Sequence, residues 1–225
     1  MGTLCEGRWW DNVLIALGLA DAGVPLKELT RTVDHVIKEA LQENGGFAYG
    51  MDFEYAADTD DTGLTVTLMS RFGNQYKDVI KKSVDWLISM QNDDGGYGAF
   101  DKNKCGSKLI RWAAYSFLDS AELFDQSSVD LTAHILEAWG EVGYTVKDEF
   151  VQRAIQYIKN EQTSFYGWEG RWGVNYIYAH GAVIPGLARV GYDLTQDWVK
   201  KSIDWLLSKQ NQDGGWGETL LSYKP

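Results

Sequence analysis

Three carboxyl groups stand within four residues of this chain, in the sequence Asp58-Thr59-Asp60-Asp61, at the start of a segment rich in Leu, Val and Met. Carboxyl groups this close cannot all ionise at low cost, so one of them is predicted to keep its proton near neutral pH and to serve as an acid. The chain also contains 10 Trp, 12 Tyr and 8 Phe. An acid among apolar and aromatic side chains suits the protonation of an alkene.

The elements that position these carboxyl groups must fit in 225 residues, which is enough for one domain with a substantial core. The formal net charge of -11 argues against a nucleic-acid partner, because phosphate binding needs clustered Lys and Arg. Cys5 and Cys105 match no metal or redox spacing and indicate free thiols in a reducing cytoplasm. Since no apolar run approaches the ~18 residues of a membrane span, we expect a cytoplasmic protein that contacts a membrane, if at all, from one side.

An internal repeat organises the chain. Residues 81–98 return almost unchanged as residues 200–217, and weaker copies occur at 36–49 and at 154–172, the latter with its Gly-Arg-Trp-Gly run at 170–173. Each copy has the apolar spacing of an amphipathic helix followed by residues suited to a left-handed turn. An apolar stretch follows each turn, so the repeated unit is predicted to be a helical hairpin. Such units bury their faces by stacking, in a solenoid or a closed α/α barrel.

One segment supports two interpretations. Residues 64–68 alternate between Leu or Val and Thr, which is the period of a strand. Their place after a Gly-Gly turn favours a helix instead. In that case Asp58 to Asp61 lie at a helix N-terminus, where free N–H groups and the helix dipole favour a carboxylate. Capping is therefore the plain structural explanation for one of these aspartates.

The acid cluster and the repeats together resemble the squalene–hopene cyclase family of class II triterpene cyclases. The Gln-x(3–5)-Gly-x-Trp pattern of residues 210–216 and the Asp58-Thr59-Asp60-Asp61-Thr62 motif carry the resemblance first. Further blocks keep the family's order along nearly the whole chain: Trp9-Trp10-Asp11, Gly45-Gly46-Phe47-Ala48-Tyr49, Gly98-Ala99-Phe100-Asp101, Asp130-Leu131-Thr132-Ala133-His134, and Gly170-Arg171-Trp172-Gly173-Val174-Asn175-Tyr176-Ile177-Tyr178.

The resemblance implies an all-α fold, an α/α toroid built from helical hairpin repeats. Family members have two α/α barrels, with the acid in the second. We therefore expect residues 1–225 to form a single domain, an incomplete barrel of the second type, lacking the first barrel and the last repeat. A fragment is the favoured interpretation, and a reduced relative is the alternative.

The resemblance also implies the catalytic roles. Asp60 matches the proton donor, and Asp58 and Asp61 shape its hydrogen bonding and help return the proton. His134 matches the histidine that pairs with the acid and, as an imidazolium, would strengthen it by favouring the conjugate base. Without the resemblance, a core histidine would be the simpler interpretation of His134.

Other positions match the surroundings of the acid. Asp130 and Tyr178 correspond to members of the same hydrogen-bonded network, through which water could reprotonate the site. The resemblance assigns four aromatic residues to the cavity wall, where ring faces stabilise a carbocation and exclude water. These lining residues are Trp10, Tyr49, Phe100 and Trp172. Most other aromatic residues, including Trp86 and Trp205, are expected to brace the repeats.

The sequence therefore predicts a class II terpene cyclase region that protonates a terminal alkene of a polyprenyl hydrocarbon and drives cationic polycyclisation. The expected chemistry needs no cofactor and no metal. Squalene, a tetraprenyl compound and a shorter prenyl chain all remain open as substrates. The alternative is a non-catalytic helical module that binds hydrophobic ligands or partners. We expect the chain alone to turn over little substrate, and to associate as a dimer or with a partner through exposed apolar surface, including part of residues 109–118.

Overall fold

A computed structural model of the protein describes residues 7–49, 56–103 and 125–223. The chain divides into two compact units, Met1–Met90 and Gln91–Pro225, and each is described by itself. Cys5, Cys105 and the apolar segment 109–118 lie outside the described residues.

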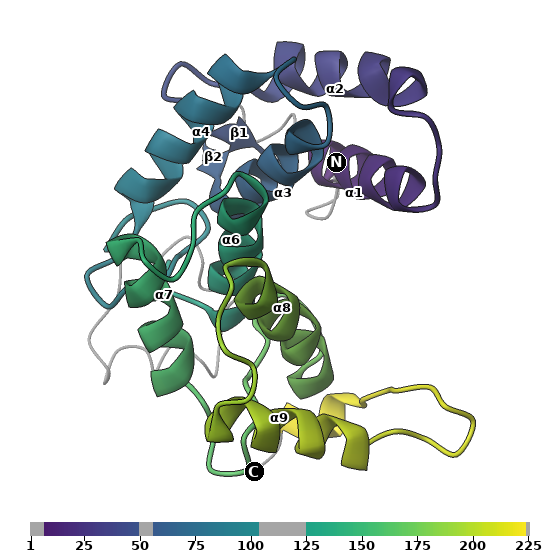
Figure 1. Ribbon diagram of the computed structural model, residues 1–225, viewed down its shortest axis with the longest axis vertical. Helices are drawn as coiled ribbons and strands as arrows, with labels where there is room; N and C mark the ends of the chain where they lie inside the picture. The colour runs from purple at the N-terminus through teal and green to yellow at the C-terminus, as the bar shows by residue number, and fades with distance from the viewer. Residues whose placement is uncertain (1–6, 50–55, 104–124, 224–225) are drawn as a thin grey trace, which may run out of the picture. The chain divides into compact units, whose positions relative to one another are not determined.

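Both units consist of helices joined by turns. In unit 1, α1 packs on α2 and on α3, and α3 packs on α4; in unit 2, α6 packs on α7 and on α8, and α8 packs on α9 (Figure 1). The elements of unit 1 are α1 (Arg8–Asp21), α2 (Leu26–Ala40), β1 (Phe47–Ala48), β2 (Ala57–Asp58), α3 (Thr59–Ser70) and α4 (Lys77–Met90). Those of unit 2 are α6 (Val129–Glu141), α7 (Glu149–Asn160), α8 (Tyr176–Arg189), α9 (Asp197–Ser208) and the short 3-10 helix η2 (Leu220–Tyr223).

The predicted helical hairpin repeats are confirmed, although the packed pairs, such as α3 with α4, are not the helices joined by a Gly-Gly turn. Residues 64–68 lie inside α3. The alternation that resembled a strand has a simple cause. Residues 65–69 are all buried, so this helix has no polar face to set a 3.6-residue period. Two short strands were not predicted. β1 and β2 pair antiparallel, with Phe47 opposite Asp58, and so tie the first Gly-Gly turn to the start of α3.

The turns that follow α2, α4, α7 and α9 are closed by the same backbone hydrogen bonds. Two backbone bonds close each turn, as from Asn92 N–H to the Gly96 carbonyl and from Gly95 N–H to the Asn92 carbonyl, both 3.0 Å. The left-handed position has a φ of +103° at Gly45, +91° at Gly95 and +86° at Gly214. The predicted Gly-Gly turns are therefore confirmed, because this backbone conformation favours glycine.

The copy at residues 154–172 differs from the prediction. Its turn closes from Thr163 N–H to the Gly167 carbonyl at 2.9 Å, and Tyr166, with a φ of +69°, takes the left-handed position. Trp168, which is fully buried, therefore corresponds to the turn aromatics Phe47 and Tyr97. The Gly-Arg-Trp-Gly run at 170–173 lies beyond the turn and has a different role.

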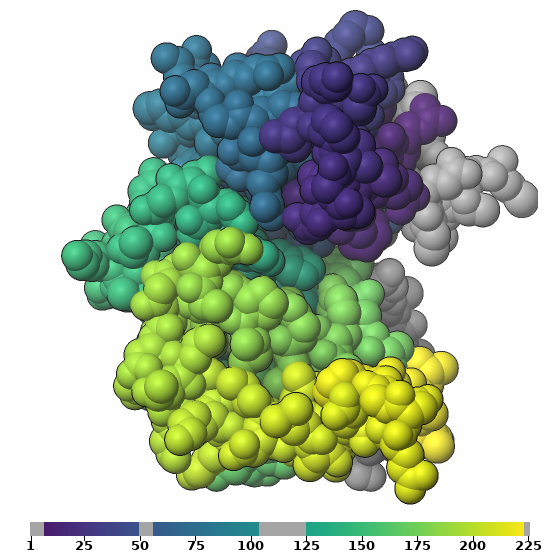
Figure 2. Space-filling view, turned by 45° about the vertical axis from the view of Figure 1, so that its right-hand side comes forward, coloured from purple at the N-terminus to yellow at the C-terminus, as the bar shows by residue number. Residues whose placement is uncertain are grey.

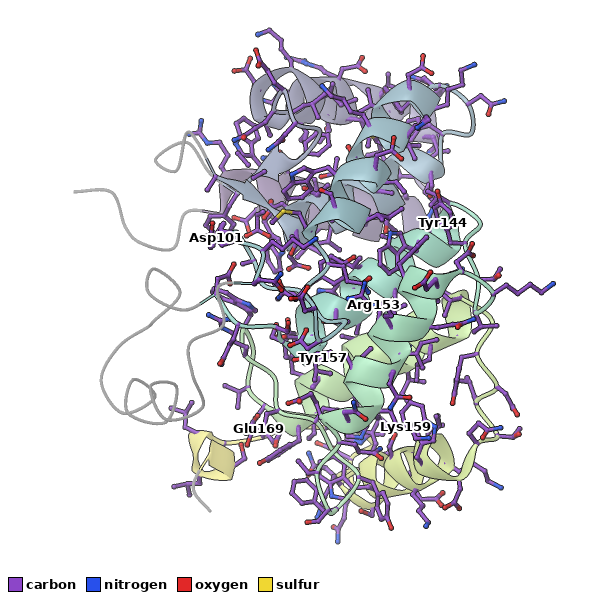
Figure 3. The ribbon with its side chains drawn as sticks, turned by 90° about the vertical axis from the view of Figure 1, so that its left-hand side faces the viewer. Asp101, Tyr144, Arg153, Tyr157, Lys159 and Glu169 are labelled. Atoms are coloured by element: carbon purple, nitrogen blue, oxygen red, sulfur yellow. The ribbon has the colours of Figure 1, made fainter. Side chains whose placement is uncertain are left out.

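In unit 2, glutamine side chains join two of the turns to the starts of α7 and α9. Gln91 donates to the carbonyl of Gly95 in its own turn at 2.9 Å and to the carbonyl of Phe150, the second residue of α7, at 2.8 Å. Gln162 bridges its own turn and Trp198, the second residue of α9, in the same way. Arg153 and Tyr157 lie one turn apart along α7 (Figure 3). The Arg153 guanidinium donates to the carbonyl of Asn92 at 2.7 Å, so the turn is held from both sides.

Large apolar side chains are exposed in both units. In unit 1 they include Ile15 and Leu19 on α1, which are 64% and 42% exposed. In unit 2 several belong to the C-terminal segment coloured yellow in Figure 2, among them Trp216, Leu220 and Leu221.

The close fit of the turns yields a prediction about glycine. A Cβ on Gly95 would clash with the backbone carbonyl of Arg153, whereas a Cβ on Gly214 meets no described atom within 4 Å. Both residues have a positive φ, so Gly214→Ala should cost only the backbone strain of about 1–2 kcal/mol. Gly95→Ala adds the steric clash and should cost at least twice as much. Urea unfolding of both variants measures the difference, and equal losses would contradict the close packing at Gly95.

Candidate functional site

Asp58 caps the helix that carries the acid cluster. Its backbone is extended, with φ -104° and ψ 133°, and its carboxylate accepts hydrogen bonds from the N–H groups of Asp60 and Asp61 at 2.7 and 3.3 Å. These are N–H groups that the first turn of a helix leaves without an internal partner. The capping explanation is therefore confirmed for Asp58, whose carboxyl group is held in place by these hydrogen bonds.

Asp61 has the opposite environment. Its side chain is 1% exposed, and neither carboxyl oxygen has a hydrogen-bond partner among the described residues. Burial raises the pKa of Asp61 well above its ordinary value, and the carboxylates of Asp58, Asp60 and Asp11 raise it further. The carboxyl group of the cluster whose pKa is raised is therefore Asp61, and its neutral form avoids the cost of an unpaired buried charge.

Asp60 points to a different neighbour. Its Oδ2 lies 3.3 Å from the indole Nε1 of Trp10, which donates to it from α1. Tyr49 lies beside the start of the same helix: its carbonyl accepts from Trp9 N–H at 3.4 Å, and a Cβ on Gly7 would touch its ring. Three elements of unit 1 thus bring Trp10, Tyr49 and the acid cluster to one end of α1 and α3.

The helices α3, α6 and α8 share a contact near their starts. In each, a side chain contacts the backbone carbonyl four residues earlier: Thr62 with Asp58 at 2.6 Å, Thr132 with Ser128 at 2.7 Å, and the His180 Nδ1 with Tyr176 at 2.7 Å. Two of these hydroxyls also accept from the turn aromatics: Thr62 from Phe47 N–H at 2.8 Å, and Thr132 from Tyr97 N–H at 3.0 Å. His180 instead contacts the ring of Trp168, with centroids 5.0 Å apart.

The contacted carbonyls locate four of the predicted site residues within their helices. Asp60 and Asp130 each stand two residues after the contacted carbonyl, which belongs to the N-cap residue of α3 or α6. In α8 and α1 the contacted carbonyl belongs to the first helical residue, Tyr176 or Arg8, to which Asn12 donates at 2.7 Å. Asp60 and Asp130 therefore occupy the second position of their helices, and Tyr178 and Trp10 occupy the third.

In unit 2, Asp130 holds a loop. Its side chain is fully buried, and its Oδ2 accepts from the backbone N–H groups of Arg171 and Trp172 at 3.0 and 2.9 Å. The ring of Tyr178 packs on the same loop, because a Cβ on Gly170 or Gly173 would lie 2.6 Å from it. Unit 2 thus brings Asp130, Tyr178 and Trp172 together, and Trp172 is 45% exposed.

Phe100 and His134 complete the predicted residues. Phe100 is half-buried in the loop after the second Gly-Gly turn, and His134 is half-buried on α6, one turn after Asp130. The predicted residues thus form two groups, each within its own unit. Trp10, Tyr49 and the three aspartates lie in unit 1. Phe100, Asp130, His134, Trp172 and Tyr178 lie in unit 2.

Three residues that support the site were not predicted. Asp125 accepts from the backbone of the Phe100 loop, the Arg171 guanidinium lies beside Asp125, and Glu218 accepts from Asn175 and Ile177 N–H at 3.2 and 2.7 Å at the start of α8. Asp125 and Glu218 act through backbone N–H groups distant in sequence, and Arg171 acts through the distant side chain of Asp125, so no spacing in the sequence signals them. Arg171 lies inside the block of residues 170–178 that supports the family resemblance, but the resemblance assigned no role to its side chain.

Two further observations concern metal ligands and membrane-spanning helices among the described residues. No group of three His, Cys, Asp or Glu side chains there is arranged to hold a metal ion. None of the described helices is both long and apolar enough to cross a membrane.

The buried Asp61 predicts an unusual pH dependence. Its folded-state pKa is raised, so its contribution to stability is fully present below the unfolded pKa of about 4 and is lost as pH rises through the folded pKa. Asp61→Asn should therefore raise the melting temperature at pH 7.5, by roughly 2–4 °C for each kcal/mol gained, and the gain should shrink toward pH 4. The matched control is Asp85→Asn, an exposed residue paired with Lys81. A less stable Asp61→Asn at pH 7.5 would contradict the assignment.

Comparison with known proteins agrees with the sequence pattern. The chain is 50% identical over 225 residues to the squalene-tetrahymanol cyclase of Tetrahymena thermophila, covering 99% of this chain and 34% of that protein. It is 36% identical over 196 residues to the squalene–hopene cyclase of Alicyclobacillus acidocaldarius, covering 79% of this chain and 31% of the other. The chain thus spans about a third of the length of these relatives.

Solved structures show the same fold. A type II terpene cyclase from Scytonema matches with a TM-score of 0.69 at 19% identity, covering 94% of this chain and 58% of that one. The ent-copalyl diphosphate synthase from Streptomyces platensis matches with a TM-score of 0.67 at 18% identity, covering 93% and 36%. The predicted all-α fold of the α/α toroid type is confirmed. Residues 10–225 match the model of the squalene-hopene cyclase C-terminal domain, and the chain belongs to that family.

Proposed function

We propose that this chain forms the acid-bearing part of a class II terpene cyclase, which protonates a terminal alkene of a polyprenyl substrate and so starts a cationic polycyclisation. The observation that carries the proposal is the acid cluster: a buried Asp61 of raised pKa next to Asp60, with Asp58 fixed as the helix cap. Family membership supports the same chemistry.

In the proposed reaction the proton leaves the carboxyl group of Asp60 and forms a C–H bond with the terminal alkene, whose π electrons supply the bonding pair. The neighbouring carbon becomes a cation, and further alkenes of the same chain attack it in turn. Loss of a proton or capture of water ends the sequence. Because the three carboxyl groups lie close enough to interact, the transferable proton belongs to the cluster, and we assign its delivery to Asp60.

Aromatic side chains supply the second requirement, which is a wall that stabilises a cation without reacting with it. A ring face attracts a desolvated cation by about 2 kcal/mol or more. We propose Trp10, Tyr49, Phe100 and Trp172 for this wall. Trp10 has an additional role, because its indole N–H contacts the carboxylate of Asp60 at 3.3 Å and so orients it.

For the substrate we propose squalene or a similar polyprenyl hydrocarbon. The two relatives described above are named for squalene cyclisation, and at 50% and 36% identity they are the basis for this choice. A shorter, aryl-bearing chain is the competing substrate class, since one structural neighbour was solved with geranylgeranyl dihydroxybenzoate. We further propose that the complete protein is cytoplasmic and contacts a membrane from one side to reach so apolar a substrate.

A chimera tests the proposed function. This chain replaces the matching third of the Tetrahymena squalene-tetrahymanol cyclase, and products from squalene are identified by mass spectrometry. The chimera should form cyclic triterpenes, and Asp60→Asn within it should reduce turnover to background, because the amide keeps the shape but cannot supply the proton. Asp85→Asn serves as the control and should retain full turnover. A correctly folded chimera without any cyclic product would favour the non-catalytic module instead.

The proposed role of His134 has its own test. If the histidine supports the acid, His134→Phe in the chimera should lower kcat by roughly 10²–10⁴-fold, the usual range for assistance by an acid–base group. His35→Phe is the matched control, since His35 lies on α2 with its ring 5.5 Å from that of Trp9. A His134→Phe variant that folds normally and turns over like the parent would identify His134 as a structural residue.

A further inference from the structure

A buried carboxylate holds the loop that carries Phe100. Asp125 is fully buried, and three consecutive backbone N–H groups donate to it: Ala99 at 2.8 Å, Phe100, and Asp101 at 2.7 Å. Gly98 makes this approach feasible, because a Cβ there would lie 2.6 Å from the carbonyl oxygen of Asp125. The Gly-Ala-Phe-Asp block therefore functions as a binding site for one internal carboxylate.

The loop that carries Trp172 has the same construction. It is bounded by Gly170 and Gly173, and its two central N–H groups, those of Arg171 and Trp172, donate to the buried carboxylate of Asp130. Each of two proposed wall aromatics is thus fixed through its backbone N–H to a buried aspartate.

Arg171 connects the two loops. Its backbone binds Asp130, while its guanidinium Nη1 lies 3.7 Å from the Oδ1 of Asp125 and donates to the carbonyl of Gln126 at 2.9 Å. The same guanidinium lies over the ring of Trp172, with its Cζ 5.1 Å from the ring centroid. Only 19% of the Arg171 side chain is exposed, so water screens these interactions weakly.

We propose that Asp125 and Arg171 form a positioning pair that fixes the aromatic wall at Phe100 and Trp172; this inference rests on the proposed cyclase function. The pair also has an electrostatic role. A bare guanidinium on one face of Trp172 would repel a carbocation on the other face, and the neighbouring carboxylate of Asp125 neutralises that charge. The pair thus holds the ring of Trp172 in place and leaves its free face able to stabilise a carbocation.

The first experiment concerns the chain itself and needs no catalytic activity. Asp125→Asn keeps the shape of the side chain, but its NH₂ group faces N–H donors and cannot accept from them. Amide hydrogen exchange at residues 99–101 and 171–172 should therefore become at least 10-fold faster in this variant. Amides in the middle of α4 and α7 should exchange as before, which excludes global unfolding as the cause. Unchanged exchange in both loops would overturn the proposal.

Arg171 is tested in parallel. Arg171→Gln removes the guanidinium but keeps the backbone bond to Asp130, so exchange should rise at residues 99–101 more than at 171–172. Arg171→Lys keeps the charge and should restore slow exchange in part. Arg189→Gln is the matched control, because Arg189 pairs with Glu137 and Glu141 and contacts neither loop in any described interaction. Equal effects of the Arg171 and Arg189 substitutions would contradict a specific pair.

The second experiment measures the products of the chimera. Asp125→Asn and Arg171→Gln should raise the fraction of partially cyclised or early-quenched products at least 5-fold and lower kcat at least 10-fold, with KM changed less than 3-fold. A role in stability alone would lower the amount of active enzyme without altering the product ratio. An unaltered product ratio with faster loop exchange would overturn the functional half of the proposal. An inactive parent chimera would instead count against the cyclase function, while the exchange data still decide whether the pair fixes the loops.

Discussion

The close packing of two turns against α4 and α7 is the constraint on which the rest of the fold depends. Gly45 and Gly95 approach the backbone carbonyls of Lys82 and Arg153 so closely that a side chain cannot fit. This contact fixes the turn, and the turn aromatic that follows donates its N–H to Thr62 in one copy and to Thr132 in the next. The packing of a turn against α4 therefore positions the start of α3, and the packing of the next turn against α7 positions the start of α6.

Once the start of a helix is fixed, its first turn can divide structural and chemical tasks between neighbouring positions. The fourth residue after the contacted carbonyl is structural: Thr62, Thr132 or His180 contacts that carbonyl. Two residues after that carbonyl the chain carries Asp60, Asp130 and Tyr178. The contact near the start of each helix and the predicted functional group therefore belong to different residues of the same turn.

The sequence predicts those features that local rules govern. The repeat at 81–98 and 200–217, the helical hairpin repeats and a capping aspartate at the start of α3 follow from spacing, glycine and helix termini. The sequence predicts the third turn at residues 170–173, which is too late in the chain, because Tyr166 stands where a glycine is expected. Only the backbone hydrogen bonds show that residues 163–167 form the turn equivalent to the Gly-Gly turns. Asp125 escaped prediction for a related reason: it binds N–H groups that any residue type offers, 24 to 26 positions away. The residues chosen from the resemblance fall into two separate groups, and local geometry orders each group on its own.

The acid cluster shows why proximity alone does not identify the proton donor. A raised pKa makes Asp61 easier to protonate, but it also makes that group a weaker acid, and an alkene is a very weak base. Asp60 differs from Asp61 in its surroundings, because its carboxyl group contacts the indole N–H of Trp10 and lies in the first turn of α3. Asp58 is engaged as the helix cap, because it accepts from the N–H groups of Asp60 and Asp61. In the proposed mechanism the three carboxyl groups would therefore have different roles: Asp58 fixes the start of α3, Asp61 is the buried group of raised pKa, and Asp60 delivers the proton.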